Sequence, residues 1–354
     1  MGKNAVKKKV LLGLSGGVDS TAAALLLQKQ GFSVQGLFFD VTGNCDETAR
    51  RAERMASELD IPFYYKDASA VFKDTIISYF CRSYEKGETP NPCIFCNPGV
   101  KFKILKETAD EMGAEFLATG HYARIRKKES GYYIYRGKNL KKDQSYMLYR
   151  LEQDILSRLI FPLGEIDSKE EIRAMLRKEE LTNAEDKDSQ EICFIGPGEH
   201  YIDYLKRYGV TSKEGDFVDR EGRVMGRHSG LIHYTIGQRK GLGITFGRPV
   251  FVTGLDPDRN QVILGENKDL FTNRIKAVLP VYSGNANARI PDDAVVQAKI
   301  RYAAPASQAV FHYTEDGFSL DFQEAQRAAT PGQSAVFYDG DRLLGGGVIA
   351  AGQR

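Results

Sequence analysis

The chain lacks long hydrophobic runs and lacks an excess of charge of either sign. Its 354 residues include 49 lysines and arginines against 47 aspartates and glutamates, a net charge of +2. This balance argues against a protein whose whole surface is positively charged, although it allows a local basic face for nucleic acid. Lys7-Lys8-Lys9 looks like the start of a signal peptide, but the apolar residues after it stop at Ser15. No run approaches membrane-spanning length, so we expect a soluble, cytoplasmic protein.

Cysteine is scarce, and its number is odd. Five cysteines in a chain of this length do not form a disulfide framework, which favours a reducing, cytosolic setting. Cys93 and Cys96 form a Cys-x-x-Cys pair, and no second such pair and no His-x-x-x-His accompanies it, so a closed zinc ribbon within one chain is poorly supported. Half a zinc site, a redox pair, an iron–sulfur ligand set and two structural cysteines remain open. Cys193 is the third thiol of interest, while Cys45 and Cys81 are assigned to packing or a mobile loop.

The Cys-x-x-Cys pair lies in a segment rich in proline. Pro90, Pro92 and Pro98 surround the two thiols. Since proline disrupts a regular helix, the sequence predicts that both thiols lie on an exposed loop.

The glycine-rich stretch from Gly13 to Ser20 lacks the lysine of the Walker phosphate-binding loop. It follows an apolar segment, Val10–Leu14, and opens a helical one, Thr21–Gln30. Two adjacent glycines, Gly16 and Gly17, let the backbone approach a ligand, and the start of a helix presents N–H groups to an anion. With Asp-Ser in place of Gly-Lys-Ser/Thr, the loop is expected to hold phosphate differently from P-loop NTPases. Close packing of a strand-to-helix turn is the alternative use of the glycines.

Strand-like and helix-like segments alternate through the first half of the chain. This rhythm predicts an α/β fold with a doubly wound parallel sheet, in which ligands bind at the carboxyl ends of the strands, here at Ser15, Asp40 and Gly120. The predicted segments after the first helix are strand 33–39, helix 47–59, strand 62–65, helix 71–84, helix 102–112 and strand 115–119.

The second half of the chain changes character. A hairpin is predicted from residues 122–126 and 132–136, and short alternating runs separated by glycine turns follow from Gly215 onward. These runs, 217–219, 249–255, 261–264, 295–301, 309–313 and 334–338, predict one or two small β-barrels. We expect three domains, at residues 1–208, 209–272 and 273–354, with a boundary near Leu270–Arg274.

Several motifs resemble those of known enzymes. Ser15-Gly-Gly-Val-Asp-Ser20 resembles the PP-loop of ATP pyrophosphatases, which cleave ATP between the α and β phosphates and adenylate a carbonyl oxygen. Further motifs, in the same order along the chain, resemble those of the bacterial tRNA-specific 2-thiouridylases. They are residues 89–97, 101–103, 118–122, 142–146, 187–189, 192–196, 234–243, 301–302 and 331–336.

The resemblance implies ATP-dependent 2-thiolation of the wobble uridine of tRNA. Adenylation of the uracil 2-carbonyl oxygen would make it a leaving group, with ATP yielding AMP and diphosphate and Mg²⁺ offsetting phosphate charge. By this resemblance the ATP contacts fall on Gly13, Leu14, Ser15, Gly16, Gly17, Val18, Asp19, Ser20, Phe39 and Gly120. For Phe39, a core position at the end of a strand is equally open.

The same resemblance implies the sulfur chemistry and the RNA contacts. Cys193 would carry a persulfide loaded by an upstream sulfur donor protein, and Cys96 would be the nucleophile that ends in a disulfide with it, which must be reduced. Target-base contacts fall on Asn91, Pro92 and Cys93, and tRNA contacts fall on His121, Lys142, Asp143, Gln144, Arg301, Tyr302 and Gln333. We expect a monomer that does not bind membranes.

The predicted hairpin supplies a basic and aromatic surface. Positive charge is carried by Lys127, Lys128, Arg136, Lys138, Lys141 and Lys142, interleaved with Tyr132, Tyr133, Tyr135 and Tyr146. This pattern suits backbone and stacking contacts with RNA, and it is also typical of a solvated hairpin.

Three alternatives remain open at this point. Some family members have aspartate where this chain has Cys93, so Cys93, Cys96 and Cys193 could instead hold a [4Fe–4S] cluster whose open iron carries sulfide. A PP-loop synthetase acting on a small molecule would not need the paired thiols. An RNA-binding zinc protein without catalysis would leave the PP-loop unexplained.

Overall fold

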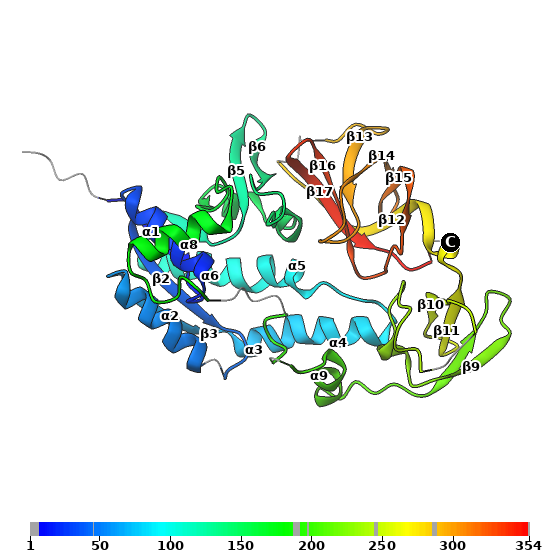
Figure 1. Ribbon diagram of the computed structural model, residues 1–354. Coiled ribbons are helices and arrows are strands. Elements are labelled where there is room, and N and C mark those ends of the chain that lie inside the picture. Colours follow the sequence, from blue (N-terminus) through cyan, green and yellow to red (C-terminus); the bar gives the residue numbers. More distant parts are fainter. Residues whose placement is uncertain are drawn as a thin grey trace, which may run out of the picture.

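The computed structural model describes residues 7–44, 46–186, 192–196, 198–243, 247–284 and 289–352. Figure 1 shows three groups of strands: a sheet flanked by helices near the N-terminus, a small sheet from the middle of the chain, and a barrel from its end. The predicted segment 187–189 and Cys45 lie outside the described residues.

The N-terminal sheet has five parallel strands in the order β3-β2-β1-β4-β7. Their bounds are Lys9–Gly13 for β1, Ser33–Asp40 for β2, Phe63–Asp67 for β3, Phe116–Thr119 for β4 and Leu159–Ile160 for β7. The order reverses after β3, because β4 pairs with the other edge of β1. This is the predicted doubly wound arrangement, and the fold class is confirmed.

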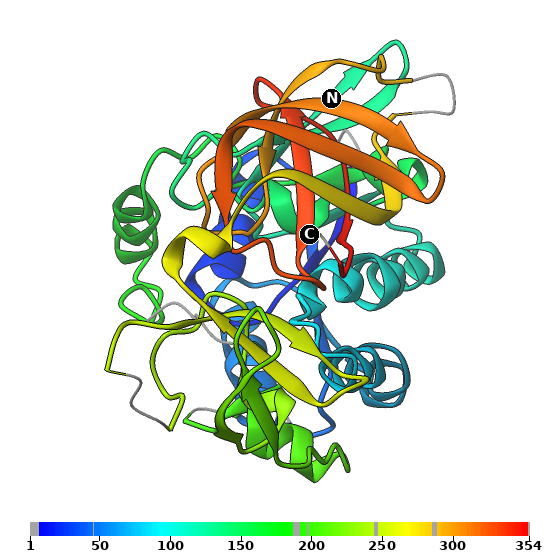
Figure 2. The ribbon, with the colours of Figure 1, turned by 90° about the vertical axis from the view of Figure 1, so that its right-hand side faces the viewer.

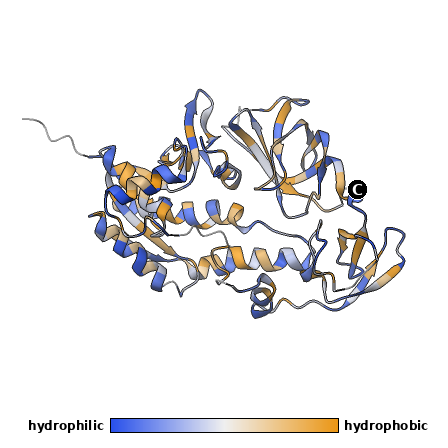
Figure 3. Cartoon of the chain, in the orientation of Figure 1, coloured by the Kyte–Doolittle hydropathy of each residue, from blue (hydrophilic) through white to orange (hydrophobic). Residues whose placement is uncertain are grey.

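Helices cover both faces of this sheet because its strands are apolar on both sides. Along β1, Val10 and Leu12 belong to the core under α1 (Val18–Lys29) and α8 (Lys169–Lys178), whereas Leu11 belongs to the core under α6 (Phe102–Met112). Helix α2 (Asp46–Glu58) is mostly hydrophilic and α1 largely apolar, as Figure 3 shows, and α1 is accordingly the more deeply buried.

The other helical segments are shorter. One continuous helical path consists of α3 (Ser69–Phe72), the π-helical turn η1 (Lys73–Ile77) and α4 (Ser78–Glu85). A second path consists of α5 (Pro92–Cys96), the π-helical turn η2 (Asn97–Lys101) and α6. The rest are η3 (Ser145–Leu148), α7 (Gln153–Leu156), α9 (Tyr201–Arg207), η4 (Leu231–His233) and η5 (Asn267–Leu270).

The middle of the chain forms a four-stranded sheet in the order β10-β11-β8-β9. Its strands are β8 (Gly215–Val218), β9 (Val224–His228), β10 (Phe251–Asp256) and β11 (Gln261–Gly265). Phe217, Val252 and Val262 are fully buried and form the centre of its own small core.

The last third of the chain forms a closed barrel. Its strands are β12 (Phe271–Tyr282), β13 (Val295–Lys299), β14 (Ser307–Thr314), β15 (Gly317–Arg327), β16 (Ser334–Asp339) and β17 (Arg342–Ile349). The barrel closes because the long strand β12 pairs with β15 along one edge and with β17 along the other. Small β-barrels in the second half were predicted, and Figure 2 shows the barrel above the middle sheet.

The predicted hairpin is present as β5 (Ala123–Lys128) and β6 (Gly131–Arg136). Its attachment was not predicted: β6 meets β17 at one residue pair, Tyr135 and Arg342, which joins the hairpin to the barrel. The barrel also completes the core beneath the N-terminal sheet, where Val336 and Leu343 belong to the same apolar cluster as Leu11.

Candidate active site

The glycine-rich loop connects β1 to the first turn of α1. Gly16 has a φ of +74°, and a Cβ atom there would lie 2.7 Å from the backbone nitrogen of Ala52 in α2, so only glycine fits. Ser20 holds the loop closed, because its hydroxyl accepts from the Ser15 N–H at 3.2 Å and donates to the Gly17 carbonyl at 3.1 Å. The first N–H groups of α1 have no partner within the helix, which makes this turn a site for an anion.

Asp19, in that first turn, contacts two residues from distant parts of the chain. Its Oδ1 accepts a hydrogen bond from the hydroxyl of Tyr122 at 2.6 Å and forms an ion pair with the ammonium of Lys169 at the start of α8. The loop itself has no lysine, and α8 places one beside it. This cation offsets the charge of Asp19 and lies beside the first turn of α1.

Asn183 bonds the glycine-rich loop to the start of α1. It is only 3 % exposed, and its amide nitrogen donates to the carbonyl of Gly16 at 2.9 Å and to the hydroxyl of Thr21 at 2.8 Å. Lys169, Tyr122 and Asn183 were not predicted as site residues. No local pattern marks Lys169 or Asn183, and the motif 118–122 contains Tyr122 without assigning it a role. All three reach the loop through contacts that span more than 100 residues of sequence.

The strand ends place the other predicted nucleotide contacts beside the loop. A Cβ at Gly13 would lie 3.2 Å from the ring of Phe39, which therefore packs against the end of β1. A Cβ at Gly120 would lie 2.9 Å from the carbonyl carbon of Asp19, so this position also requires glycine. Asp40 has a different role, because its carboxylate is buried and accepts from the N–H groups of Thr42 and Gly43 in the following turn.

The prediction that Cys93 and Cys96 lie on an exposed loop was wrong. Both are in α5, which continues through η2 into α6 without interruption. Pro92 occupies the first turn of α5, where a backbone N–H has no helical partner to lose, and Pro98 lies at the start of the wider π-helical turn. Prolines at these two positions are compatible with a helix.

The three thiols differ in exposure. Cys96 is 4 % exposed and Cys93 half-buried, while Cys193 is exposed on the segment 192–196. Burial raises the pKa of Cys96 to about 12 and also raises the pKa of Cys93. The segment that carries Cys193 is anchored in the apolar cluster that contains Cys96, because Phe194 packs against Phe72 and Phe80 with ring centroids 5.4 and 5.3 Å away.

Lys101 is the common neighbour of the three thiols. Their proximity, with Cys193 the largest influence, raises the pKa of the Lys101 ammonium. Lys101 also acts on His121, whose pKa falls to about 3, chiefly because the ring is shielded from solvent and secondly because of this ammonium. His121 is therefore neutral, and it pairs through Nδ1 with the hydroxyl of Thr119 at 2.7 Å.

This arrangement connects the thiols with the loop. Lys101 interacts electrostatically with the thiols and with His121. The residue before His121 is Gly120, which packs against Asp19. The predicted nucleotide contacts and the predicted sulfur-bearing residues are thus parts of one region.

Several predicted tRNA contacts hold the protein's own elements together. Asp143 is 6 % exposed and accepts from the N–H groups of Gly137 and Ser145. Arg301 donates to the Ala328 carbonyl and to Thr330, and the ring of half-buried Tyr302 lies 6.1 Å from that of Tyr146. Lys142, which precedes Asp143, is half-buried. Gln144, which follows Asp143, accepts a hydrogen bond from the N–H of Tyr122.

The segment that precedes the thiols is tied to the barrel and to the middle of the chain. Gln333 donates to the carbonyl of Thr89 at 2.7 Å, and the hydroxyls of Thr89 and Thr235 are 3.2 Å apart. Asn91 contacts the sulfur of Met147 at 3.7 Å, and Pro92 is buried. The target-base candidates Asn91, Pro92 and Cys93 therefore stand where the three parts of the chain meet.

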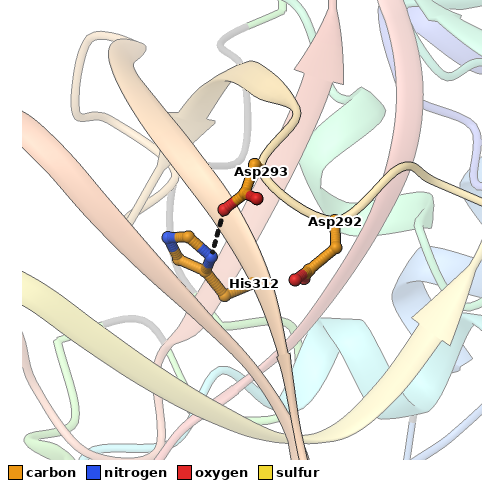
Figure 4. A group of neighbouring side chains, drawn as sticks. All are labelled: Asp292, Asp293 and His312. Atoms are coloured by element: carbon orange, nitrogen blue, oxygen red, sulfur yellow. Dashed lines mark ion pairs between the residues drawn. The ribbon is translucent and has the colours of Figure 1, made fainter.

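Within the described ranges, one group of side chains has the ligand spacing of a single metal ion: Asp292, Asp293 and His312 on the barrel (Figure 4). Its groups are already engaged, since His312 Nδ1 pairs with Asp293 at 3.0 Å and Asp292 accepts the N–H of Tyr313. The three cysteine sulfurs do not form such a group among the described residues.

Comparison with known proteins agrees with this architecture. Family models match residues 8–197, described as a tRNA methyl transferase HUP domain, residues 202–266, described as a tRNA methyl transferase PRC-barrel domain, and residues 282–349, described as an aminomethyltransferase beta-barrel domain. The fold and the loop thus define a PP-loop protein of the HUP class with two β-domains.

Relatives identify the family within this class. The tRNA-specific 2-thiouridylase MnmA of Syntrophomonas wolfei is 48 % identical over 346 residues, covering 96 % of this chain and 99 % of the relative. The protein of the same name from Clostridium acetobutylicum is 42 % identical, covering 97 % of this chain and 100 % of the relative. The chain belongs to the tRNA-specific 2-thiouridylase family.

In the described part of the chain, every helix is too short or too polar to cross a bilayer.

Proposed function

We propose that this protein is a tRNA-uridine 2-sulfurtransferase that thiolates the wobble uridine of tRNA at the expense of ATP. The observation that carries the proposal is the shared region formed by the glycine-rich loop and the three thiols, linked through Lys101, His121 and Gly120. An adenylating loop beside a thiol pair suits the exchange of a carbonyl oxygen for sulfur. A small-molecule synthetase would not need that pair.

In the first step, the uracil 2-carbonyl oxygen attacks the α-phosphorus of ATP, and diphosphate leaves. The loop from Gly13 to Ser20 binds the phosphates, and Phe39 and Gly120 border the adenosine. Lys169 adds positive charge beside the loop, and Mg²⁺ accompanies ATP to neutralise the departing diphosphate. The product is an O-adenylated base whose C2 is open to attack.

In the second step, the terminal sulfur of a Cys193 persulfide attacks C2, and AMP leaves. The Cys96 sulfur then attacks the Cys193 sulfur and breaks the persulfide S–S bond, so the terminal sulfur stays on the base. A Cys96–Cys193 disulfide forms, and a thiol reductant restores both thiols. The exposure of Cys193 suits loading by a donor protein, and the burial of Cys96 suits an internal attack.

The remaining assignments follow from this function. We propose an adenylation and thiolation domain at residues 1–208, a small β-domain at 209–272 and a barrel at 273–354, acting as a cytoplasmic monomer. Asn91, Pro92 and Cys93 contact the target base. His121, Lys142, Asp143, Gln144, Arg301, Tyr302 and Gln333 form or support the tRNA surface, together with the basic, tyrosine-rich hairpin.

The test is a tRNA thiolation assay on anaerobically purified protein with measured iron and acid-labile sulfide. We expect iron-free protein to be active with ATP and a persulfide donor. Cys96→Ser and Cys193→Ser should abolish thiolation and retain adenylation, whereas Asp19→Ala should lose both, and Cys81→Ser serves as the control. Activity that requires a reconstituted cluster and inorganic sulfide would contradict the relay and make Cys93, Cys96 and Cys193 cluster ligands.

A further inference from the structure

Tyr122 connects the nucleotide loop with the segment proposed to contact tRNA. Its hydroxyl donates to Asp19 Oδ1 at 2.6 Å. Its backbone N–H donates to the side-chain oxygen of Gln144 at 2.9 Å, and its carbonyl accepts from the Gln144 N–H at 2.9 Å. Gln144 therefore bonds both backbone groups of Tyr122, and the side chain of Tyr122 bonds Asp19.

Close packing limits the freedom of Tyr122. The side chain is 3 % exposed and lies in the core beneath α1. A Cβ at Gly137 would lie 2.9 Å from the Tyr122 carbonyl oxygen, and one at Gly120 would lie 2.9 Å from the Asp19 backbone. Because Gln144 bonds the backbone of Tyr122 and neighbouring backbones lie close on both sides, we expect a shift of Gln144 to be transmitted to the ring of Tyr122.

The segment after Gln144 is anchored in the barrel. The hydroxyl of Tyr146 donates to the carbonyl of Ser334 at 2.8 Å, and the hydroxyl of Ser145 lies 3.2 Å from that of Tyr338. Residues 142–144 thus lie between the barrel and the nucleotide loop. RNA that binds this segment would therefore act on residues that are bonded to the barrel on one side and to Tyr122 on the other.

We propose that Tyr122 is a positioning residue that couples tRNA binding at residues 142–144 to ATP binding by orienting the carboxylate of Asp19. This inference rests on the proposed function. A carboxylate beside phosphate repels it unless the carboxylate is held and neutralised, and Tyr122 and Lys169 do so through one oxygen, Oδ1. Coupling of two binding events is reciprocal, so tRNA must tighten ATP binding by the same factor by which ATP tightens tRNA binding.

The test variant is Tyr122→Phe, which removes one hydroxyl and keeps the ring that fills the core. The dissociation constant of unmodified tRNA is measured with and without a non-hydrolysable ATP analogue and Mg²⁺, and that of the analogue with and without tRNA. We expect each ratio to be on the order of tenfold in the wild type and close to one in Tyr122→Phe. Tyr313→Phe, which loses a hydroxyl contact to the Ile290 carbonyl in the barrel, should keep the wild-type ratios.

The outcomes separate coupling from simple support of the fold. A wild-type ratio of one overturns the proposal, and so does a Tyr122→Phe protein with an unchanged ratio. If Tyr122→Phe weakens both ligands equally, lowers the unfolding midpoint and keeps the ratio, its role is structural and the proposal is also overturned. Absence of thiolation by the wild type would instead contradict the proposed function.

Discussion

Gly16 and Gly17 are adjacent in sequence but face different constraints. Gly16 has a φ of +74° and lies against the backbone of Ala52, whereas Gly17 has a φ of −79°. The nearest atom to a Cβ at Gly17 is the Ser15 hydroxyl oxygen, 3.6 Å away. Glycine is therefore required by the fold at Gly16, whereas the fold leaves room for a side chain at Gly17.

The pair allows a matched test. Gly16→Ala should lower the free energy of unfolding by about 2 kcal/mol or more, because a non-glycine residue is strained at this φ and its methyl group meets a backbone. Gly17→Ala should change it by less than about 0.5 kcal/mol. Urea unfolding of both variants measures this, and equal losses would contradict the assignment.

His121 makes the stability depend on pH. Its folded-state pKa of about 3 lies below the ordinary value because the ring is shielded from solvent and lies near Lys101. Between about pH 6.5 and pH 3 the unfolded chain therefore binds a proton that the folded chain does not. Stability from this group is full above pH 6.5 and is lost progressively as the pH falls.

We expect acidification from pH 7 to pH 5 to destabilise the wild type by about 1–2 kcal/mol more than His121→Gln, which cannot titrate. Urea unfolding at both pH values for both proteins gives the difference. Parallel losses in the two proteins would show that His121 is accessible to protons in the folded state.

Single residues were predictable where a local pattern carries the information. The placement of the glycine loop at the carboxyl ends of the strands follows from a strand, two glycines and a helix in succession. Lys169 and Asn183 reach the loop by long-range contacts, and a lone residue of these types carries no signal of its own. Tyr122 ends the motif 118–122, but its contact with Asp19 cannot be predicted from that motif. Their discovery required the tertiary structure.

Among the secondary-structure elements, the junction between the barrel and the segment before α5 is closely packed. Gly332 has a φ of +87°, and a Cβ there would lie 3.0 Å from Glu88 and 3.1 Å from the backbone of Thr89. Thr89 also donates its N–H to the Pro331 carbonyl at 2.9 Å. The turn between β15 and β16 thus sets the position of the residues that lead into the thiol-bearing helix.

Gly332→Ala should reduce thiolation about tenfold or more while adenylation changes little, because the added methyl pushes residues 88–89 away from the barrel. Gly340→Ala is the control, since Gly340 also has a positive φ, +57°, but has open space around it. Rates of thiolation and of ATP–diphosphate exchange would be compared. Equal effects of both substitutions would assign the loss to backbone strain alone.

The main error in predicting elements concerned the thiol-bearing helix. The number of prolines predicts a loop, but the positions of the prolines allow a helix. Pro92 is the first residue of α5, and Pro98 lies in the first turn of the π-helical segment η2. The strands of the barrel were predicted in part, because 295–301, 309–313 and 334–338 alternate, but β17 was not. Its glycine-rich sequence, Arg342–Ile349, resembles a turn, and only its pairing with β12 and β16 makes it a strand.

At the scale of the whole molecule, the first and last thirds of the chain share a core. Val336, Tyr338 and Leu343 are fully buried in the cluster that contains Leu11 and Leu117 of the N-terminal sheet. The hydroxyls of Tyr146 and Tyr149 contact Ser334. The barrel is thus part of the N-terminal unit's interior, which a linear division of the sequence does not show.

A protein truncated after residue 270 should therefore lose more than RNA binding. We expect a lower unfolding temperature and weakened binding of an ATP analogue, because buried tyrosines and leucines become exposed. Calorimetry and analogue titration against the full chain are the measurements. A truncated protein with the original unfolding temperature and affinity would contradict the shared core.

The shared core also has a consequence for synthesis on the ribosome. Strand β1 is made within the first residues and Leu343, which belongs to the same apolar cluster as Leu11, within the last, so this cluster cannot be complete until translation is nearly finished. At about 5–20 residues per second, the N-terminal sheet, complete at Ile160, waits roughly 10–40 s for Leu343 with an apolar surface uncovered. We therefore expect nascent chains, and chains that end before the barrel, to expose this apolar surface to chaperones and proteases.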